Sequence, residues 1–462
     1  MRFLKTSKQY LFGGLGLGLG YFGLTFVWIV NPFLVDLQKN VWLAPFACFL
    51  FVLALSLFWA IAFYLSNHFM KDEQENSKKV FCLSVFFALV ELLRCYLFSG
   101  FPWAILSYGW LDTPLSIFVT WFGPYIFNSL IIIVGFNLLY SSIINNIFKI
   151  IFFFTILFGV QNYYSEKGID ESIESLTVRL VQPNIKQKDK WKKENELQHL
   201  EILIDLSNKS PKPDLVVWPE TAVYWLPEEN PEKLQMIAEQ VRSPLLFGAL
   251  RFNRDTKKLF NSVFLIDDKG EIQSFYDKTF LVPFGEYLPL GGLLRNFNIF
   301  GNSYRLIDGF SRGSGLELLK FSQFQTFLPL ICYEALFSNE ILGEVNEAHW
   351  ILNITNDAWF GNNSGPKQHL NIARMRALEN NIPLIRVSNN GISAKISKNG
   401  KIEEYIPLNK RGFLDVGLSL NTEREKTYYA TFGKNVSAYL HLVLLLLLFL
   451  YYLISSRKEK GD

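Results

Sequence analysis

The sequence predicts a chain of two kinds of structure, an α-helical membrane domain and an α/β domain with a large sheet system. Half of the 462 residues are hydrophobic and 16% are aromatic, and the mean hydropathy is positive, which is high for a soluble protein of this size. The apolar residues cluster near both ends, whereas the stretch between them has mixed charge and enough length for one sizeable domain. We therefore expect a membrane domain at 1–167, a globular domain at 168–430, and a last span with a short tail at 431–462.

Six apolar segments are each near the roughly 20 residues needed to cross a bilayer. They lie at about 9–31, 41–66, 80–100, 114–141, 149–164 and 436–455. The glycines of the first segment are expected to let helices approach closely; they are Gly14, Gly16, Gly18 and Gly20. The spacing of a dinucleotide fingerprint at 18–23 has neither the preceding strand nor the following amphipathic helix that such a site needs.

Basic residues near the span ends predict the orientation, because they tend to stay in the cytoplasm. If five spans precede the globular domain, every basic residue near a span end except Lys39 falls on the same side of the membrane. The residues on that side are Arg2, Lys5, Lys8, Lys71, Lys78, Lys79, Lys149, Arg457, Lys458 and Lys460. The globular domain should then face outward, into the periplasm of a Gram-negative cell. A net charge of +3 is too small to indicate nucleic acid. The five histidines are scattered, so neither a metal site nor another cofactor is expected.

Short β-rich apolar runs alternate with helical stretches in the globular region, a pattern typical of an α/β domain. Amphipathic helices fit 191–208 and 366–380, and Asn399-Gly400 predicts a hairpin turn that closes a terminal β-ribbon. The expected strands are 177–182, 214–218, 245–249, 262–266, 273–276, 327–332, 350–354, 384–388 and 393–397.

Three of these strands lead into a chemically reactive residue: Glu220, Lys278 or Cys332. Taken singly, each has an ordinary interpretation, a solvated charge or a small core thiol. The other three cysteines lie in apolar segments, so Cys332 has no evident disulfide partner. Since α/β sites lie off the carboxyl ends of strands, the three side chains are expected to converge. Together they supply a nucleophile, a base and a cation for a developing oxyanion.

Several longer motifs resemble those of the apolipoprotein N-acyltransferases, whose outer domain belongs to the nitrilase, or carbon-nitrogen hydrolase, superfamily. This resemblance implies a nitrilase-like αββα sandwich. Six spans are fewer than members of this family usually have, and loss of a pair would keep the outer domain on the same side. The matching stretches are Val-Val-Trp-Pro-Glu-Thr-Ala at 216–222, Tyr-Asp-Lys-Thr-Phe-Leu-Val-Pro-Phe-Gly-Glu-Tyr-Leu-Pro at 276–289, Ile-Cys-Tyr-Glu at 331–334, Asn-Asp-Ala-Trp-Phe-Gly at 356–361, Gln-His-Leu-Asn-Ile-Ala-Arg-Met-Arg-Ala-Leu-Glu at 368–379, Ser-Asn-Asn-Gly-Ile-Ser at 388–393 and Ser-Gly-Phe-Pro-Trp at 99–103.

The resemblance implies a role for each matching residue. Cys332 would be the nucleophile, Glu220 the general base and Lys278 the group that stabilises the oxyanion. Glu286 would hold Lys278 or assist the base, and Tyr333 and Glu334 would shape the site beside the thiol. Trp191 resembles a tryptophan that helps to admit lipid, although a core aromatic at a helix start fits equally well. Trp359, with Asn356 and Asp357, resembles a site wall.

The remaining matching residues are expected to give structural support. Arg376 and Glu379, with Arg374 nearby, have the helical spacing of an ion pair. Asn389 and Asn390 precede Gly391 in what reads as a tight turn.

The implied reaction passes an acyl chain from a membrane phospholipid, through a thioester on the cysteine, to the amine of a diacylglyceryl cysteine at the N-terminus of an apolipoprotein. The implied location is the bacterial inner membrane, with the catalytic domain in the periplasm. Two alternatives from other classes remain open on the sequence. A membrane-tethered amidase or nitrilase would pass the acyl group to water through the same three residues, and a structural membrane protein would use none of them.

Overall fold

The computed structural model describes residues 6–35, 41–71, 76–140, 175–289, 309–320, 326–419 and 425–458. The chain divides into two compact units. The first consists of Met1–Asp170 and Lys426–Asp462, and the second is Glu171–Glu425. The predicted span at 149–164 lies outside the described residues.

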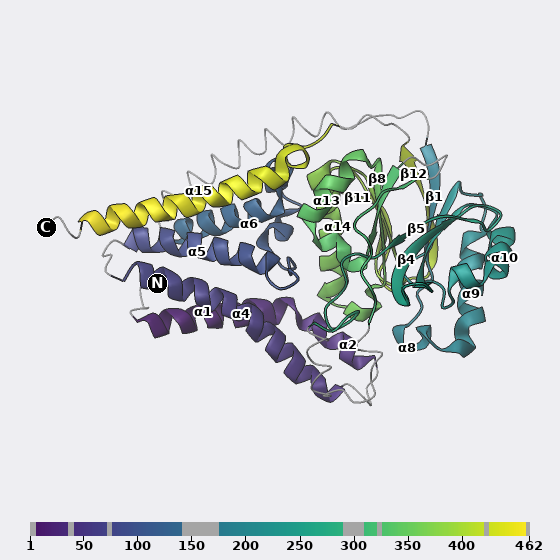
Figure 1. Ribbon diagram of the computed structural model, residues 1–462, viewed down its shortest axis with the longest axis horizontal. Coiled ribbons are helices and arrows are strands. Elements are labelled where there is room, and N and C mark those ends of the chain that lie inside the picture. Colours follow the sequence, from purple (N-terminus) through teal and green to yellow (C-terminus); the bar gives the residue numbers. More distant parts are fainter. Residues whose placement is uncertain are drawn as a thin grey trace. The chain divides into compact units, whose positions relative to one another are not determined.

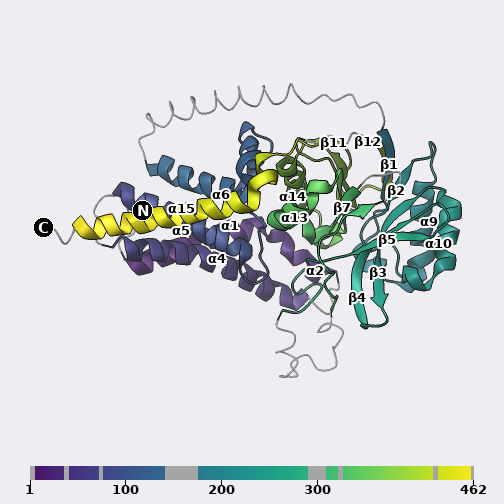
Figure 2. The ribbon, with the colours of Figure 1, turned by 45° about the horizontal axis from the view of Figure 1, so that its top comes forward.

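The first unit is helical. Its helices are α1 (Ser7–Thr25), α2 (Asn31–Leu34), α4 (Ala44–Phe69), α5 (Asn76–Tyr96), α6 (Ile117–Tyr140) and α15 (Tyr428–Lys458). Figures 1 and 2 both show α15 running alongside α6. At the break in α6, Gly123 has a φ of 76° before Pro124, and a Cβ on this glycine would clash with the ring of Tyr429. The bend in α6 therefore makes room for the start of α15.

The glycines of α1 confirm the predicted close approach at two of four positions. A Cβ on Gly14 would lie 2.6 Å from the carbonyl oxygen of Trp59, and one on Gly18 would lie 2.8 Å from Cα of Ser56, both on α4. Among the residues that the structure describes, none outside α1 lies within 4 Å of a Cβ placed on Gly16 or Gly20. The prediction is wrong for those two because residues four apart share one helix face and residues two apart do not.

Two helices of the described residues, Val41–Phe69 and Pro114–Leu139, are long and apolar enough to cross a membrane. The pair Ser7–Thr25 and Val27–Leu34, bent by 64°, adds a third if it forms one span, and Tyr439–Tyr451 of α15 is a shorter apolar stretch. Helix α5 contains Glu91 and Arg94, whose side chains are buried and joined by an ion pair of 2.8 Å. Arg94 also donates to the carbonyl oxygens of Phe101 and Trp103. This pair ties α5 to the segment that follows it.

Two six-stranded sheets form the second unit. One has the order β12-β1-β2-β3-β4-β5 and the other β11-β10-β9-β8-β7-β6. The strands are β1 (Ser175–Gln182), β2 (Leu215–Val217), β3 (Leu245–Asn253), β4 (Lys258–Ile266), β5 (Ile272–Asp277), β6 (Leu319–Lys320), β7 (Thr326–Ile331), β8 (Trp350–Thr355), β9 (Leu384–Ser388), β10 (Ser393–Ile396), β11 (Ile402–Ile406) and β12 (Gly412–Ser419).

The sheets pack face to face, and helices cover their outer faces. The core between the sheets joins residues such as Val178 and Val263 of the first to Ile331 and Leu352 of the second. Helices α9 (Glu196–Ser207) and α10 (Pro231–Val241) pack on the outside of the first sheet, and α13 (Ser338–Glu344) and α14 (Ser364–Asn380) on the outside of the second. Figure 1 shows the four layers in this order. The unit is the αββα sandwich that the sequence predicted.

All nine predicted strands are present, and the hairpin at Asn399-Gly400 joins β10 to β11. The prediction that this ribbon is terminal is wrong, because β12 follows it and pairs antiparallel with β1 over the full length of both strands. Both predicted helices of this region are present as well, although α9 begins at Glu196 rather than at 191.

Candidate active site

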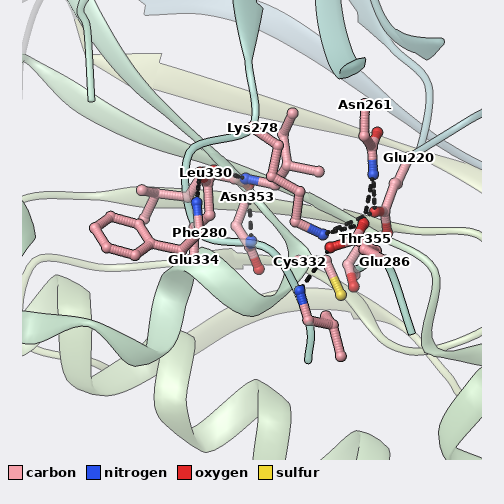
Figure 3. A network of polar contacts seen from close by, with 12 residues as sticks. Glu220, Asn261, Lys278, Phe280, Glu286, Leu330, Cys332, Glu334, Asn353 and Thr355 are labelled. Carbon is pink, nitrogen blue, oxygen red and sulfur yellow. Dashed lines mark hydrogen bonds and ion pairs between the residues drawn. The ribbon is translucent and has the colours of Figure 1, made fainter. Parts of the chain in front are cut away.

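Glu220, Lys278 and Cys332 follow strands that belong to different sheets. Glu220 comes shortly after β2 and Lys278 directly after β5, both in the first sheet, while Cys332 comes directly after β7 in the second. Figure 3 shows their side chains pointing toward one another. The three residues that the sequence singled out therefore meet where strands of the two packed sheets end.

Cys332 occupies a sharp turn from strand to helix. Its φ is 51°, in the left-handed region that few residues other than glycine adopt, and such a conformation costs on the order of 1–3 kcal/mol. A short 3₁₀ helix, Cys332–Leu336, begins at this residue. The turn holds the thiol at a fixed point off the end of β7.

Cys332 is 7% exposed. Burial is the main cause that raises its pKa well above the usual 9, and the nearby charge of Glu220 raises it further. The ammonium of Lys278 and the hydroxyl of Thr355, which is hydrogen-bonded to the thiol, act in the opposite direction. The resting group is therefore a thiol, and a base must remove its proton before the sulfur can attack.

Two carboxylates hold Lys278, and an amide holds the two carboxylates. Nζ of Lys278 lies 2.8 Å from Oε1 of Glu286 and 3.4 Å from Oε1 of Glu220. Burial by itself lowers the pKa of Lys278, but Glu286 and Glu220 outweigh it, so the pKa rises above 10.5. Asn261 donates Nδ2 to Oε1 of both glutamates, over 2.7 Å and 3.1 Å. The site thus holds a permanent cation and a carboxylate that is fixed beside the thiol (Figure 3).

Glu334 connects the two strand ends. Its carboxylate accepts hydrogen bonds from the backbone N–H groups of Ile331, Thr279 and Phe280 and from the hydroxyl of Tyr276, over 2.6–3.2 Å. Burial is the main cause that raises the pKa of Glu334 to about 7, and these hydrogen bonds oppose the shift. The carboxylate ties the turn of Cys332 to the segment after Lys278, so its contacts position both residues. Tyr333, also predicted beside the thiol, is buried, with its ring edge-on to Phe337 at 5.2 Å.

The two predicted tryptophans are both partly exposed. Trp191 is 51% exposed, and its ring centroid lies 5.7 Å from that of Tyr224. The alternative interpretation of Trp191 as a core aromatic is therefore wrong. Trp359 is 39% exposed and lies in the 3₁₀ helix Asp357–Phe360.

A buried polar network lies behind Cys332. His369 donates Nε2–H to the carbonyl oxygen of Cys332 over 3.1 Å, and its Nδ1 lies 2.9 Å from Oδ1 of Asp357. Arg386 donates Nη2 to both oxygens of Asp357. Burial would raise the pKa of Asp357, but Arg386 and His369 lower it to about 2. Asp357 is thus a buried anion that supports the cysteine turn, rather than the wall of a cleft.

The supporting residues of α14 and the following turn are buried too. Arg376 and Glu379 form the predicted ion pair over 3.0 Å, with both side chains inaccessible to solvent. Asn389 donates Nδ2 to the carbonyl oxygen of Ile185 and to Oδ1 of Asn356. These contacts hold the segment after β1 against the ends of β8 and β9.

Sequence reasoning missed three residues of the site, Asn261, Thr355 and Lys190. Asn261 carried a usable signal, because an amide in the middle of the apolar strand β4 must find a partner when buried. Thr355 ends β8 directly before the matched Asn-Asp motif. Lys190 carried no signal, because it stands among other lysines in a polar stretch.

Among the residues that the structure describes, no group of histidines, cysteines and carboxylates suits a metal ion. The chemistry available at the site is therefore that of a thiol, a carboxylate and an ammonium in a buried setting. This set of groups suits acyl transfer through a covalent intermediate.

An αββα domain with these three groups, joined to apolar helices, defines a membrane-bound protein of the carbon-nitrogen hydrolase type. Residues 177–428 match the carbon-nitrogen hydrolase family, and residues 2–137 match the apolipoprotein N-acyltransferase N-terminal domain. Apolipoprotein N-acyltransferase from Brucella suis is 33% identical over 434 residues, covering 90% of this chain and 80% of that protein. The protein of the same name from Agrobacterium fabrum is 33% identical over 436 residues, covering 89% and 80%. The chain belongs to the apolipoprotein N-acyltransferase family.

Solved structures of the nitrilase superfamily are similar to the sandwich unit. Saccharomyces cerevisiae Nit3 covers 55% of this chain and 93% of its own, with a TM-score of 0.41 and 15% identity. A carbon-nitrogen hydrolase from Helicobacter pylori covers 53% and 89%, with a TM-score of 0.41 and 16% identity.

Proposed function

We propose that this acyltransferase moves a fatty acyl chain from a membrane glycerophospholipid to the N-terminal amine of the diacylglyceryl cysteine of apolipoproteins, through a thioester on Cys332. The convergence of the buried side chains of Glu220, Lys278 and Cys332 is the observation that carries the proposal. Membership of the family supplies the lipoprotein acceptor, and the apolar helices supply the membrane. The phospholipid donor is part of the proposal, because an acyl ester in the same bilayer is the substrate that a membrane-anchored site can reach.

The first half of the reaction forms the thioester. Glu220 takes the proton of the Cys332 thiol, and the sulfur attacks the carbonyl carbon of the lipid ester. The carbonyl oxygen of the ester becomes an oxyanion, which the ammonium of Lys278 stabilises. When the intermediate collapses, the carbon–oxygen bond breaks and Glu220 returns its proton to the departing oxygen. The products are a lysophospholipid and an acylated Cys332.

The second half transfers the acyl chain to the amine. The neutral amine attacks the thioester carbonyl, Glu220 accepts an amine proton, and Lys278 again stabilises the oxyanion. The carbon–sulfur bond then breaks, so that an amide forms, and the proton on Glu220 returns to the sulfur. Water would compete at this step, and the burial of the site limits its access.

We further propose the arrangement of the whole chain. Residues 1–167 form a multi-pass anchor of about five spans, 168–430 the catalytic domain, and 431–462 a last span with a cytoplasmic tail. The positions of the basic residues support an inner-membrane protein with its catalytic domain in the periplasm. Trp191 and Trp359, both partly exposed, are the proposed contacts for incoming substrate.

Mass spectrometry of lipoproteins from cells depleted of this protein tests the proposed reaction. An N-acyltransferase leaves lipoproteins with a free amine and a diacyl anchor when it is absent, and complementation with the wild type restores the third chain. An amidase or a structural protein would leave the lipoproteins unchanged. Normal triacylated lipoproteins in depleted cells would contradict the proposal.

Charge-removing variants test the two assisting residues in the same assay. Glu220→Gln and Lys278→Met should stay folded and membrane-inserted but lose about 100-fold or more in turnover, because each role is worth a few kcal/mol of barrier. Lys209→Met, which removes an exposed lysine, serves as the control and should complement fully. Near-normal turnover in either site variant would show that its role is wrongly assigned.

A further inference from the structure

Lys190 is a buried lysine that the steps above do not use. It ends α8 (Gln187–Lys190) and is 2% exposed, whereas Lys186 and Lys188 on the same stretch are exposed. Its Nζ donates to the backbone carbonyl oxygen of Glu220 over 3.0 Å. Within the described part of the chain, no carboxylate lies within ion-pair distance of this ammonium.

Such a placement is costly, because an ammonium taken out of water without a partner carboxylate loses hydration that one carbonyl cannot replace. Packing alone does not require a charge here, since a methionine would fill the space of a lysine stem without that loss. The charge itself is therefore the feature that needs a physical explanation.

Glu220 stands on a strained piece of backbone. The next residue, Thr221, has a φ of 47°, so the turn that carries the carboxylate is not one that the chain adopts on its own. Asn261 and Lys278 hold the carboxylate end of Glu220. Lys190 holds the backbone carbonyl of the same residue, so Glu220 is held both at its backbone and at its carboxylate.

The charge balance of the site favours a second cation. Lys278 forms ion pairs with Glu220 and Glu286, so without Lys190 one ammonium would face two carboxylates while further negative charge develops on the substrate. Lys190 interacts electrostatically with Glu220 and with Cys332. Its ammonium lies 3.0 Å from the carbonyl oxygen of Glu220, so its positive charge offsets part of the negative charge of the site.

We propose that Lys190 is a positioning residue of the acyl transfer, which fixes the backbone of Glu220 and places a second positive charge beside this residue. This inference rests on the proposed function of the same site. The segment between β1 and α9 then has two roles. Trp191 contacts substrate, and Lys190 takes part in the reaction.

The proposal has a consequence for the pH dependence of the reaction. The titratable groups that interact electrostatically with Lys190 are Glu220 after β2, Cys332 after β7 and His199 on α9. Burial lowers the pKa of Lys190 to about 8, although Glu220 and Cys332 raise it in part. Burial likewise lowers the pKa of His199, so His199 is neutral near pH 7. Lys190 is then mostly charged at pH 7 and loses its charge as the pH rises through about 8, where the rate should fall.

Four full-length proteins in native membranes test the inference: the wild type, Lys190→Arg, Lys190→Met and the control Lys188→Met. The transfer rate and the alkylation rate of Cys332 by iodoacetamide are measured from pH 6 to pH 10. Lys190→Met should lower the transfer rate at pH 7 by about 10-fold to 100-fold and remove the fall near pH 8. Lys190→Arg keeps its charge and should move that fall to higher pH, and Lys188→Met should match the wild type. The unfolding temperature of Lys190→Met should be no lower than that of the wild type, since the variant no longer buries an ammonium.

The outcomes separate this inference from the proposed function. One outcome overturns the inference and leaves the proposed function standing. In it, the wild type forms a thioester on Cys332, and both Lys190 variants have the transfer rate of the wild type and the same fall in rate near pH 8. If Lys190→Met fails to accumulate in membranes, an unchanged pH profile in Lys190→Arg overturns the inference by itself. No acyl group on Cys332 in the wild type would instead overturn the proposed function.

Discussion

At the scale of single residues, the thiol of Cys332 is held between two sides of the sandwich. Glu220 and Lys278 approach it from the first sheet, and Thr355 from the second. The Thr355 hydroxyl also lies 3.1 Å from Oδ1 of Asp357. A threonine has one hydroxyl proton, so it can donate to the carboxylate while the sulfur is acylated and to the sulfur when a thiolate forms.

Thr355→Val should therefore weaken the thiolate. The substitution keeps the shape but removes the donor that lowers the pKa of Cys332, so that pKa should rise. Alkylation of Cys332 by iodoacetamide at pH 8 should slow by about 10-fold, since a hydrogen bond to a charged group is worth about 1.5–3 kcal/mol. Thr355→Ser keeps the hydroxyl and should react like the wild type. Equal alkylation rates for the valine variant and the wild type across the pH range would argue against this contact.

The residues of the site differ in how far the sequence reveals them. Glu220, Lys278 and Cys332 each come soon after an apolar strand, so their positions follow from one rule about strand ends. Lys190 stands in a polar stretch and is buried only because residues 185–190 pack against distant partners, such as Asn389 and Asn356. No local pattern contains that information. For Arg376 and Glu379, helical spacing predicted the ion pair but not its burial.

At the scale of elements, β3 supports the segment that carries Glu220. Gly248 of β3 donates its N–H to the carbonyl oxygen of Pro219, and its own carbonyl accepts from the N–H of Ala222. A Cβ on Gly248 would lie 2.5 Å from the backbone nitrogen of Thr221 and 2.6 Å from Cα of Glu220. Backbone atoms cannot rotate away as a side chain can, so only a glycine allows this approach.

Gly248→Ala should thus displace Glu220 although the glycine makes no contact with substrate. We expect a loss of at least about 10-fold in turnover, together with destabilisation by about 1–3 kcal/mol from overpacking. Turnover and thermal unfolding of the purified protein measure the two effects. Gly343→Ala on α13 is the matched control, because no atom of the described part of the chain outside α13 lies within 4 Å of a Cβ placed there. Wild-type turnover in Gly248→Ala would show that the segment tolerates displacement.

Strand β12, which the sequence did not predict, depends on a distant partner. Strand β12 pairs with β1 along its whole length: Ser419 lies opposite Ser175 at one end, and Gly412 lies opposite Gln182 at the other. The two strands are far apart in the chain. The sequence of β12 contains glycine and aspartate, which are depleted in strands, so local propensity opposes the structure that forms. Strand β9, in contrast, is a continuous buried apolar run around Arg386, and it has the bounds expected from the sequence.

At the scale of the whole molecule, the basic residues predict one orientation. A reporter active only outside the cytoplasm should be active when fused after residue 200 and inactive when fused after Lys458, because the positive charges near span ends stay in the cytoplasm. A reporter active only in the cytoplasm should give the opposite result with the same fusions. Activity of the first reporter after Lys458, and not after residue 200, would rule out a periplasmic catalytic domain.

A covalent intermediate on Cys332 is the central claim for the molecule, and trapping it is the most direct test. The full-length protein is incubated with phospholipid and no acceptor amine, and its peptides are then analysed by mass spectrometry. The wild type should carry a fatty acyl group on Cys332 that neutral hydroxylamine removes, and added acceptor should remove it by transfer. Cys332→Ala should be folded but inactive, and Cys332→Ser should lose turnover, whereas alanine at Cys48, Cys82 or Cys95 should have little effect. An acyl group on none of the four cysteines, with turnover intact in Cys332→Ala, would contradict the thioester mechanism.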